Sequence, residues 1–373
     1  MINVCEPVLD GNETKYVLDC FQNNWISSNG PYNLRFEESL AGYIGVKHAL
    51  SCSSGTAALH LALVALGIGP GDEVIIPDFT LIVSANTVIQ TGATPVLVEV
   101  DARTWCIDPG KIEEKISPHT RAIMVVHMYG HPCDMPVIMK IARKHGLKVI
   151  EDCAESHGAE IDGKKTGSFG DLSCFSFYGN KIITSGEGGM VLCDDDEIAA
   201  RVALLRNQGF QSPRFVHNVM GFNYRLTNVQ AAIGLAQMEK VEEKVARKRW
   251  ISQNYSELLA GNIHLILPYE AAGAKNVYWM YGIVLNGSTM GKEKVMESLL
   301  KRGVETRAFF CPMHLQPVFR ETKGKIPHPS FEQEYPISEN LWKNGFYLPS
   351  GLSLDRDQIE YISKSLLECI QPG

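Results

Sequence analysis

Between about residues 47 and 195 the chain alternates short β-rich runs with helix-like stretches, and this alternation restricts its fold more than any other feature. A helical pattern, TAALHLALVALG, follows HALSC; TLIVSANTVIQ follows EVIIP; and DMPVIMKIARKHG follows RAIMVV. Three further apolar runs come next: LKVIED, SCFSF and MVLCD. Runs that are apolar on both sides and alternate with amphipathic helices predict an α/β fold with a mostly parallel sheet covered by helices.

The pattern of β-like and helical segments changes after a long helical stretch, LTNVQAAIGLAQMEKVEEKVARKRW, which ends at Trp250. Residues 251–373 mix helical stretches with shorter β-like runs such as WMYGIVL and GVETRAF. We therefore predict a large domain over residues 1–250 and a smaller C-terminal α+β domain over residues 251–373.

Composition limits the partners of this chain. Its 373 residues are 45% hydrophobic and 21% charged, and 35 Lys and Arg against 42 Asp and Glu give a net charge of −7. A nucleic-acid surface needs clustered positive charge, so we expect no nucleic-acid partner. No apolar run approaches the ~20 residues that cross a bilayer, and the N-terminus resembles no signal peptide. We expect no membrane association and a cytoplasmic location.

The ten cysteines form no CxxC pair and are too dilute for a disulfide scaffold. Several lie in apolar runs, where a free cysteine behaves as a small hydrophobic residue. Neither HExxH nor paired Cys/His spacing occurs, so we predict no metal site.

The run from Ser51 to Leu59 follows a β-like segment and opens a strong helix. A helix N-terminus offers unpaired N–H groups to a phosphate. Gly55 permits close approach of a ligand, and Ser54 or Thr56 adds a hydroxyl. The alternative is a Ser/Thr cap without a ligand. Neither a Walker A motif nor GxGxxG is present, which removes the usual support for nucleotide hydrolysis and Rossmann binding.

Two other features carry chemistry. Glu151 and Asp152 end a predicted strand, where a carboxylate can hold a cationic ring nitrogen or a metal, although Asp is also a common helix cap. Lys181 lies between apolar residues and a glycine-rich turn, where burial would lower its pKa and free a nucleophilic amine. An ordinary surface lysine remains the alternative.

A phosphate cradle, a carboxylate and a reactive lysine together match pyridoxal 5′-phosphate (PLP). Its aldehyde forms a Schiff base with lysine, its ring nitrogen takes an acidic partner, and its phosphate suits a helix N-terminus. The combination is far more specific than any single member.

With these motifs the chain resembles the DegT/DnrJ/EryC1/StrS sugar aminotransferases, a branch of the fold-type I (aspartate aminotransferase-like) PLP enzymes. The resemblance runs nearly end to end, through WISSNGP (25–31), SSGTAALHLAL (53–63), GIGPGDEVIIP (67–77), VHMYGHPCDM (126–135), VIEDCAESHGA (149–159), FSFYGNKIITSGEGG (175–189), GFNYRLTNVQAAIGLAQ (221–237) and CPMH (311–314). Within the family the motifs are most similar to those of the members that form GDP-perosamine.

The resemblance implies roles for individual residues. Lys181 matches the Schiff-base lysine that also moves the proton, and Asp152 matches the partner of the ring nitrogen. Glu155 matches a position near the cofactor's 3-hydroxyl. The phosphate contacts are implied for Ser54, Gly55, Thr56 and Ser176 and, from the neighbouring subunit of a homodimer with shared sites, for Asn223.

Trp25, Arg225 and His314 fall in segments that border the substrate or its charged groups in relatives. Leu81 departs from the family pattern, because an aromatic residue usually stands there and can stack on the cofactor.

The implied reaction is transfer of the amino group of L-glutamate to the 4-keto carbon of a nucleotide-linked 4-keto-6-deoxy sugar. GDP-4-keto-6-deoxy-D-mannose is favoured, while TDP- and UDP-linked sugars remain open. A related group of sugar dehydratases carries His at the lysine position, and Lys181 argues against it. A non-catalytic PLP-binding regulator is the alternative of a different class, since fold alone does not establish catalysis.

Overall fold

The computed structural model describes residues 1–213, 215–287, 290–321 and 333–370. In this part of the chain, seven strands form a central sheet in the order β1-β9-β8-β5-β4-β2-β3. These strands are β1 (His48–Cys52), β2 (Glu73–Pro77), β3 (Thr94–Val98), β4 (Thr120–Val126), β5 (Lys148–Asp152), β8 (Leu172–Ser176) and β9 (Gly189–Cys193). All pairings are parallel except those of β9, which runs against both β1 and β8. The predicted α/β fold with a mostly parallel sheet is confirmed.

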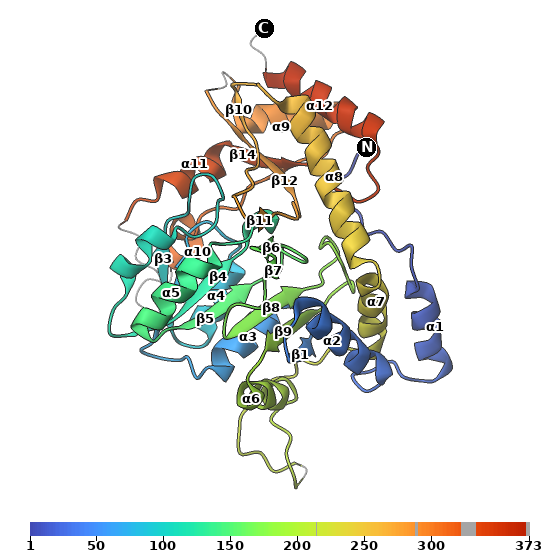
Figure 1. The fold of residues 1–373 in the computed structure, drawn as a ribbon, viewed down its shortest axis with the longest axis vertical. Coiled ribbons are helices and arrows are strands. Elements are labelled where there is room, and N and C mark those ends of the chain that lie inside the picture. Colours follow the sequence, from blue (N-terminus) through green and yellow to red (C-terminus); the bar gives the residue numbers. More distant parts are fainter. Residues whose placement is uncertain (214, 288–289, 322–332, 371–373) are drawn as a thin grey trace.

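Helices cover both faces of the central sheet (Figure 1). One face packs against α2 (Pro31–Ile44), α5 (Met135–His145) and α7 (Asn228–Met238), and the other against α3 (Gly55–Ala65), α4 (Val83–Gln90) and α6 (Asp196–Arg206). Along β4, Ile123 and Val125 enter the first core while Ala122 and Met124 enter the second. The strand is therefore buried on both sides, as its continuous apolar run predicts. Helix α1 (Glu13–Gln22) packs against α7.

A second, smaller sheet follows, with the order β10-β12-β14-β13. Its strands are β10 (Leu265–Ile266), β12 (Tyr281–Leu285), β13 (Arg307–Ala308) and β14 (Gly345–Leu348), and its helices are α9 (Lys292–Lys301), α11 (Pro336–Asn344) and α12 (Arg356–Ile370). The short helix α10 (Pro317–Glu321) instead places Phe319 in a core of the large sheet. Three short strands, β6 (Glu160–Ile161), β7 (Lys164–Lys165) and β11 (Ala274–Lys275), form a bridge between the two parts of the chain.

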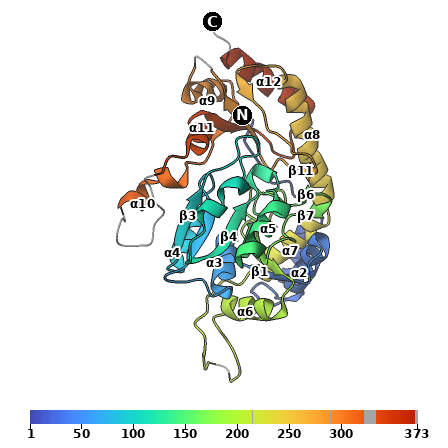
Figure 2. The ribbon, with the colours of Figure 1, turned by 60° about the vertical axis from the view of Figure 1, so that its left-hand side comes forward.

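The long helical pattern divides into two helices. Helix α7 ends at Met238, and α8 (Val241–Leu259) continues past the expected end at Trp250. In Figures 1 and 2, α8 runs from the end of α7 up to the small sheet. Val241 and Val245 join the core of the large sheet, whereas Ile251 and Tyr255 join the core of the small one. The domain division at residue 250 falls inside this helix and stays a prediction. No helix in the described ranges has the length and apolar character that crossing a bilayer requires.

Candidate active site

The three predicted features meet at one edge of the central sheet. Strands β1 and β8 both run against β9, so they point the same way, and β8 is parallel to β5. Their carboxyl ends therefore lie side by side. The cradle begins after β1, Asp152 ends β5, and Lys181 lies in the turn that follows β8, where its N–H donates to the Tyr178 carbonyl at 2.9 Å.

The Lys181 side chain is buried, with 8% of its surface exposed. Its Nζ lies 4.0 Å from Oε1 of Glu155 and 3.8 Å from the centroid of the Trp279 ring. The other Glu155 oxygen, Oε2, accepts a hydrogen bond from the Tyr129 N–H at 2.8 Å. Lys181 is therefore not the surface lysine of the alternative interpretation.

Burial and charge oppose one another at this lysine. Burial lowers the pKa of Lys181, and the carboxylates of Glu155 and Asp152 limit the fall. Burial likewise raises the pKa of Asp152, and the Ala154 N–H, which donates to its Oδ1 at 3.0 Å, and Lys181 act against it. The pKa of Glu155 is also raised by burial and restrained by Lys181. No helix begins at Asp152, so its carboxylate caps only a turn.

The predicted phosphate cradle, formed by Ser54, Gly55 and Thr56, lies at the N-terminus of α3, where the backbone closely approaches Ser176. The Ser54 hydroxyl caps α3 by accepting from the Ala57 N–H at 3.1 Å, which leaves the N–H groups of Gly55 and Thr56 in the first turn without intrahelical partners. A Cβ on Gly55 would lie 2.7 Å from the Cβ of Ser176, and one on Gly189 would lie 2.2 Å from the Ser54 carbonyl oxygen. Both glycines are needed to bring Ser176 against the start of α3.

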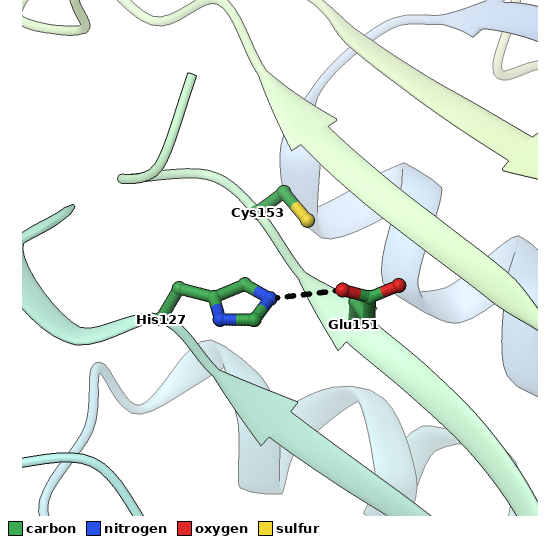
Figure 3. A group of neighbouring side chains, drawn as sticks. All are labelled: His127, Glu151 and Cys153. Carbon is green, nitrogen blue, oxygen red and sulfur yellow. Dashed lines mark hydrogen bonds and ion pairs between the residues drawn. The ribbon is translucent and has the colours of Figure 1, made fainter. Parts of the chain in front are cut away.

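Glu151, next to Asp152, is a fully buried structural carboxylate. Its Oε1 accepts from the N–H groups of Phe169 and Gly170, both at 2.8 Å, and its Oε2 accepts from the Gly167 N–H at 2.9 Å. Oε2 also lies 3.1 Å from Nε2 of His127 (Figure 3). Burial opposes ionisation, but the hydrogen bonds, that of His127 first, outweigh it and lower the pKa of Glu151.

The tautomer of His127 follows from its contacts. The Cys133 N–H donates to Nδ1 at 3.0 Å, so the ring proton is on Nε2 and is donated to Glu151. Cys153 lies beside this pair, and the three potential ligand atoms are within 4.8 Å of one another. Burial raises the pKa of the Cys153 thiol, and the oxygens of Glu151 are already hydrogen-bonded. His127, Glu151 and Cys153 therefore form a hydrogen-bonded structural group rather than a metal site.

The segment around Asn223 lies beside the cradle of its own chain. The Ser53 N–H donates to the Tyr224 carbonyl at 2.8 Å, and the rings of Phe222 and Tyr224 stack on each other and contact His60 of α3. Side chains alternate along extended backbone, so Asn223 points the other way and is exposed.

Arg225 lines an open cavity of about 960 Å³ with Arg206 of α6. Its Nη1 donates to Oδ1 of Asn207 at 2.9 Å, whereas Arg206 is held by Glu37 at 2.6 Å. Arg225 therefore keeps guanidinium donors available at the cavity, as a residue that binds charged groups requires.

The remaining sequence-predicted residues are more scattered. Trp25 is 48% exposed and Leu81 is 42% exposed. His314 is buried, and its Nδ1 lies 2.7 Å from Oδ2 of Asp78, whose Oδ1 accepts from the His314 N–H at 2.9 Å. The structure thus joins His314 to Asp78 rather than to Lys181.

Sequence reasoning missed three groups at or near this site. Asp78 and His127 follow β2 and β4, and the rule that polar side chains at the carboxyl ends of parallel strands form sites would have selected them. Trp279 precedes β12 of the small sheet, and nothing in its local pattern points to Lys181. Only the tertiary fold brings it there.

The donor set fits PLP. A buried amine is available for the aldehyde, a buried carboxylate for the ring nitrogen, and an open helix N-terminus with a neighbouring hydroxyl for the phosphate.

Comparison with known proteins agrees with this arrangement. Residues 7–367 match the model of the DegT/DnrJ/EryC1/StrS aminotransferase family. A GDP-perosamine synthase from Caulobacter vibrioides is 47% identical over 369 residues, which are 98% of this chain and 97% of the relative. A second GDP-perosamine synthase, from Escherichia coli O157:H7, is 44% identical over 98% of both chains. The resemblance inferred from the motifs is confirmed.

The fold also matches solved structures. DesV of S. venezuelae, in complex with a ketimine intermediate, superposes with a TM-score of 0.90 at 33% identity and covers 97% of this chain and 95% of its own. The predicted fold-type I architecture is confirmed.

We predict that Glu151→Gln destabilises the protein by about 2–4 kcal/mol at neutral pH, because an amide NH₂ faces the donors of Gly167 and His127 and leaves them unpaired. Urea unfolding measures this difference. Glu297→Gln, in an exposed i,i+4 pair on α9, is the matched control and leaves the unfolding free energy near that of the wild type.

The difference in unfolding free energy between the wild type and Glu151→Gln changes with pH in a predictable direction. Since the pKa of Glu151 is lowered in the folded protein, its stabilising contribution is complete above the ordinary glutamate pKa and is lost as the pH falls through the lower folded value. The gap between wild type and Glu151→Gln therefore narrows in acid. A gap that stays constant or widens below about pH 4 would contradict the assignment of Glu151 as a buried carboxylate.

Proposed function

The chain belongs to the DegT/DnrJ/EryC1/StrS family of PLP-dependent aminotransferases, and we propose that it transfers the amino group of L-glutamate to the 4-keto carbon of GDP-4-keto-6-deoxy-D-mannose. The products are 2-oxoglutarate and GDP-perosamine. The observation that carries this proposal is the buried Lys181 amine, 4.0 Å from Glu155 and within the electrostatic influence of Asp152, in a chain that relatives named GDP-perosamine synthase match over nearly their whole length.

When bound, PLP supplies an aldehyde that accepts the amino group and an electron-poor ring that stabilises negative charge on the reacting carbon. Lys181 would hold the cofactor covalently through Nζ, and its amine would serve as the base that moves the proton between donor and cofactor. Burial favours its neutral form, which such a base requires. Asp152 would pair with the ring nitrogen and favour its protonated form, and Glu155 would serve the 3-hydroxyl.

The phosphate binds at the N-terminus of α3. The N–H groups of Gly55 and Thr56 point outward from the first turn, where the helix dipole favours an anion. The hydroxyl of Ser176 lies beside Gly55 and adds a donor, and Ser54 fixes the helix end through its cap. The exposed aliphatic side chain of Leu81 could pack on the ring, without the geometry of an aromatic pair.

Trp25, Arg225 and His314 serve the substrate in this proposal. Arg225 faces the open cavity with free donors and suits the diphosphate. Trp25 is exposed near the start of α2 and offers a face to the sugar or base. His314 is buried with its Nδ1 against Asp78 and its Nε2 3.5 Å from Oε1 of Glu339, so it shapes the site rather than offering an exposed ring.

The enzyme works as a homodimer with shared sites. The chain between α6 and α7 projects from the body of the molecule (Figure 1) and exposes the side chains of Phe215, Val216 and Met220, the last at 92%. Apolar side chains gathered on one exposed segment favour contact with another protein, and a second copy is the partner. Asn223, exposed at the base of this segment, reaches the cofactor phosphate of that copy.

We place the enzyme in the cytoplasm. Its ten cysteines are free thiols, most of them buried, in keeping with a reducing compartment.

A product assay tests the substrate assignment. GDP-, TDP- and UDP-linked 4-keto-6-deoxy sugars are each incubated with L-glutamate, and the products are identified by mass spectrometry and NMR. We expect the 4-amino product from the GDP sugar at the highest kcat/KM. Preference for a TDP or UDP sugar would replace the nucleotide assignment. A cofactor-loaded protein that aminates none of them would favour the non-catalytic regulator.

Borohydride reduction tests Lys181. We predict that the reagent attaches the cofactor to the peptide that contains Lys181 and that Lys181→Ala loses at least about a thousandfold in turnover, since base and covalent attachment are both removed. Lys164→Ala, at an exposed position, is the matched control and keeps full activity. Wild-type turnover in Lys181→Ala would refute its role.

A mixed dimer tests whether Asn223 acts across the interface. Lys181→Ala and Asn223→Asp, each of low activity, are re-equilibrated together. If Asn223 reaches the partner's site, one site of each mixed dimer carries both defects and the other is wholly wild type, so activity partly returns.

Lys181→Ala mixed with Asp152→Asn is the control, because these two residues share one site within a chain and no wild-type site forms. Recovery in the control, or none with Asn223→Asp, would contradict the shared-site assignment. A protein that sediments as a monomer at working concentration would also contradict it.

A further inference from the structure

Trp279 is the contact that the small-sheet part of the chain makes with Lys181. It lies two residues before β12, it is 3% exposed, and the centroid of its ring lies 3.8 Å from Nζ of Lys181. Its Nε1–H donates to the carbonyl oxygen of Asn180 at 2.7 Å. One side chain therefore contacts both the amine of Lys181 and the peptide that precedes this residue.

The Trp279 backbone is held in place from two sides. Its carbonyl oxygen accepts from Nζ of Lys248 at 2.9 Å, a buried lysine of α8. On the other side, Gly130 has a φ of +102°, and a Cβ there would lie 2.8 Å from the N atoms of Tyr278 and Trp279. Only glycine allows this close approach, and the Val277 N–H then donates to the Gly130 carbonyl at 3.1 Å.

The loop that contains Tyr129 and Gly130 also holds Glu155, the acidic partner of Lys181. The ring of Tyr129 stacks on that of Trp279 with centroids 6.2 Å apart, and its N–H donates to Glu155. Trp279 and Glu155 thus contact Tyr129 and flank the Lys181 amine together. Lys181, Glu155, Tyr129 and Trp279 thus form a closed ring of contacts, in which Tyr129 offers its ring to Trp279 and its backbone N–H to Glu155.

We infer that Trp279 is a positioning residue for Lys181: its ring face holds the amine, and its ring N–H holds the peptide that precedes it. The face of an indole ring is electron-rich and attracts an ammonium group most strongly where water is excluded, as it is here. The inference rests on the proposed function, which gives the amine of Lys181 its task. It adds that the small-sheet part of the chain fixes the position of this amine.

The test follows the Lys181 amine itself. The full-length chain, freed of cofactor, is labelled with acetic anhydride over a range of pH, and mass spectrometry of the Lys181 peptide gives the pKa and reactivity of this amine. The titratable groups that interact with Lys181 are Glu155, Asp152, Cys5 and His157, and all remain in every variant. The readout needs no turnover, so its outcome is separate from that of the substrate assays.

Trp279→Leu removes the ring, and we expect the pKa of Lys181 to fall by about one unit. Trp279→Phe keeps a ring face but loses the donor to Asn180, so the pKa stays near that of the wild type. Trp250→Leu is the matched control, since its indole lies 4.1 Å from the Arg247 guanidinium, and it leaves Lys181 unchanged.

Fluorinated tryptophans avoid any question of folding, because fluorine withdraws electrons from the ring face with little change of shape. Each added fluorine is expected to lower the pKa of Lys181 in a regular series. In Trp279→Phe the pKa of Lys181 should no longer change with the number of fluorine atoms. This control excludes effects of the other tryptophans. A pKa of Lys181 that is constant across the fluorinated series and in Trp279→Leu would overturn the inference.

Discussion

The buried amine of Lys181 is the interaction on which the site depends. An isolated charge inside a protein is costly, so this lysine needs partners or must lose its proton. Glu155 at 4.0 Å, the nearby charge of Asp152 and the Trp279 ring at 3.8 Å supply those partners. Burial at the same time favours the neutral amine. The pKa of Lys181 is therefore lowered by burial while its partners limit the fall, which suits a group that binds an aldehyde and moves a proton.

The residues around Lys181 hold these groups in fixed relative positions. Glu151 gathers three backbone N–H groups and the proton of His127, and it lies next to Asp152 at the end of β5. Gly55 and Gly189 let the start of α3 approach Ser176. Strand ends, a helix N-terminus and a buried hydrogen-bonded structural group thus converge from separate parts of the sequence. The carboxylate of Glu151 has partners on both oxygens, and a buried polar group satisfied in this way makes its surroundings rigid.

Much of this arrangement could be predicted from the sequence. Alternating apolar runs and helices imply a parallel sheet, and parallel strands bring their carboxyl ends together, so the cradle, Asp152 and Lys181 were expected at one edge. The surroundings of Lys181 could not be predicted, because Trp279 reaches it only through the docking of a distant strand. The burial of His314 against Asp78 likewise depends on tertiary contacts. The break between α7 and α8 interrupts a continuous helical pattern, so periodicity alone did not reveal it.

The proposed transfer requires the protein to keep the amino group after glutamate has left and before the sugar binds. A single-turnover experiment with [¹⁵N]glutamate tests it most directly: the cofactor-loaded protein is treated with the labelled donor, all free donor is removed, and the GDP-linked 4-keto sugar is then added. The account predicts that ¹⁵N stays with the protein after the donor is removed and then appears at carbon 4 of the sugar. Failure of the protein to retain ¹⁵N before the sugar is added would contradict it.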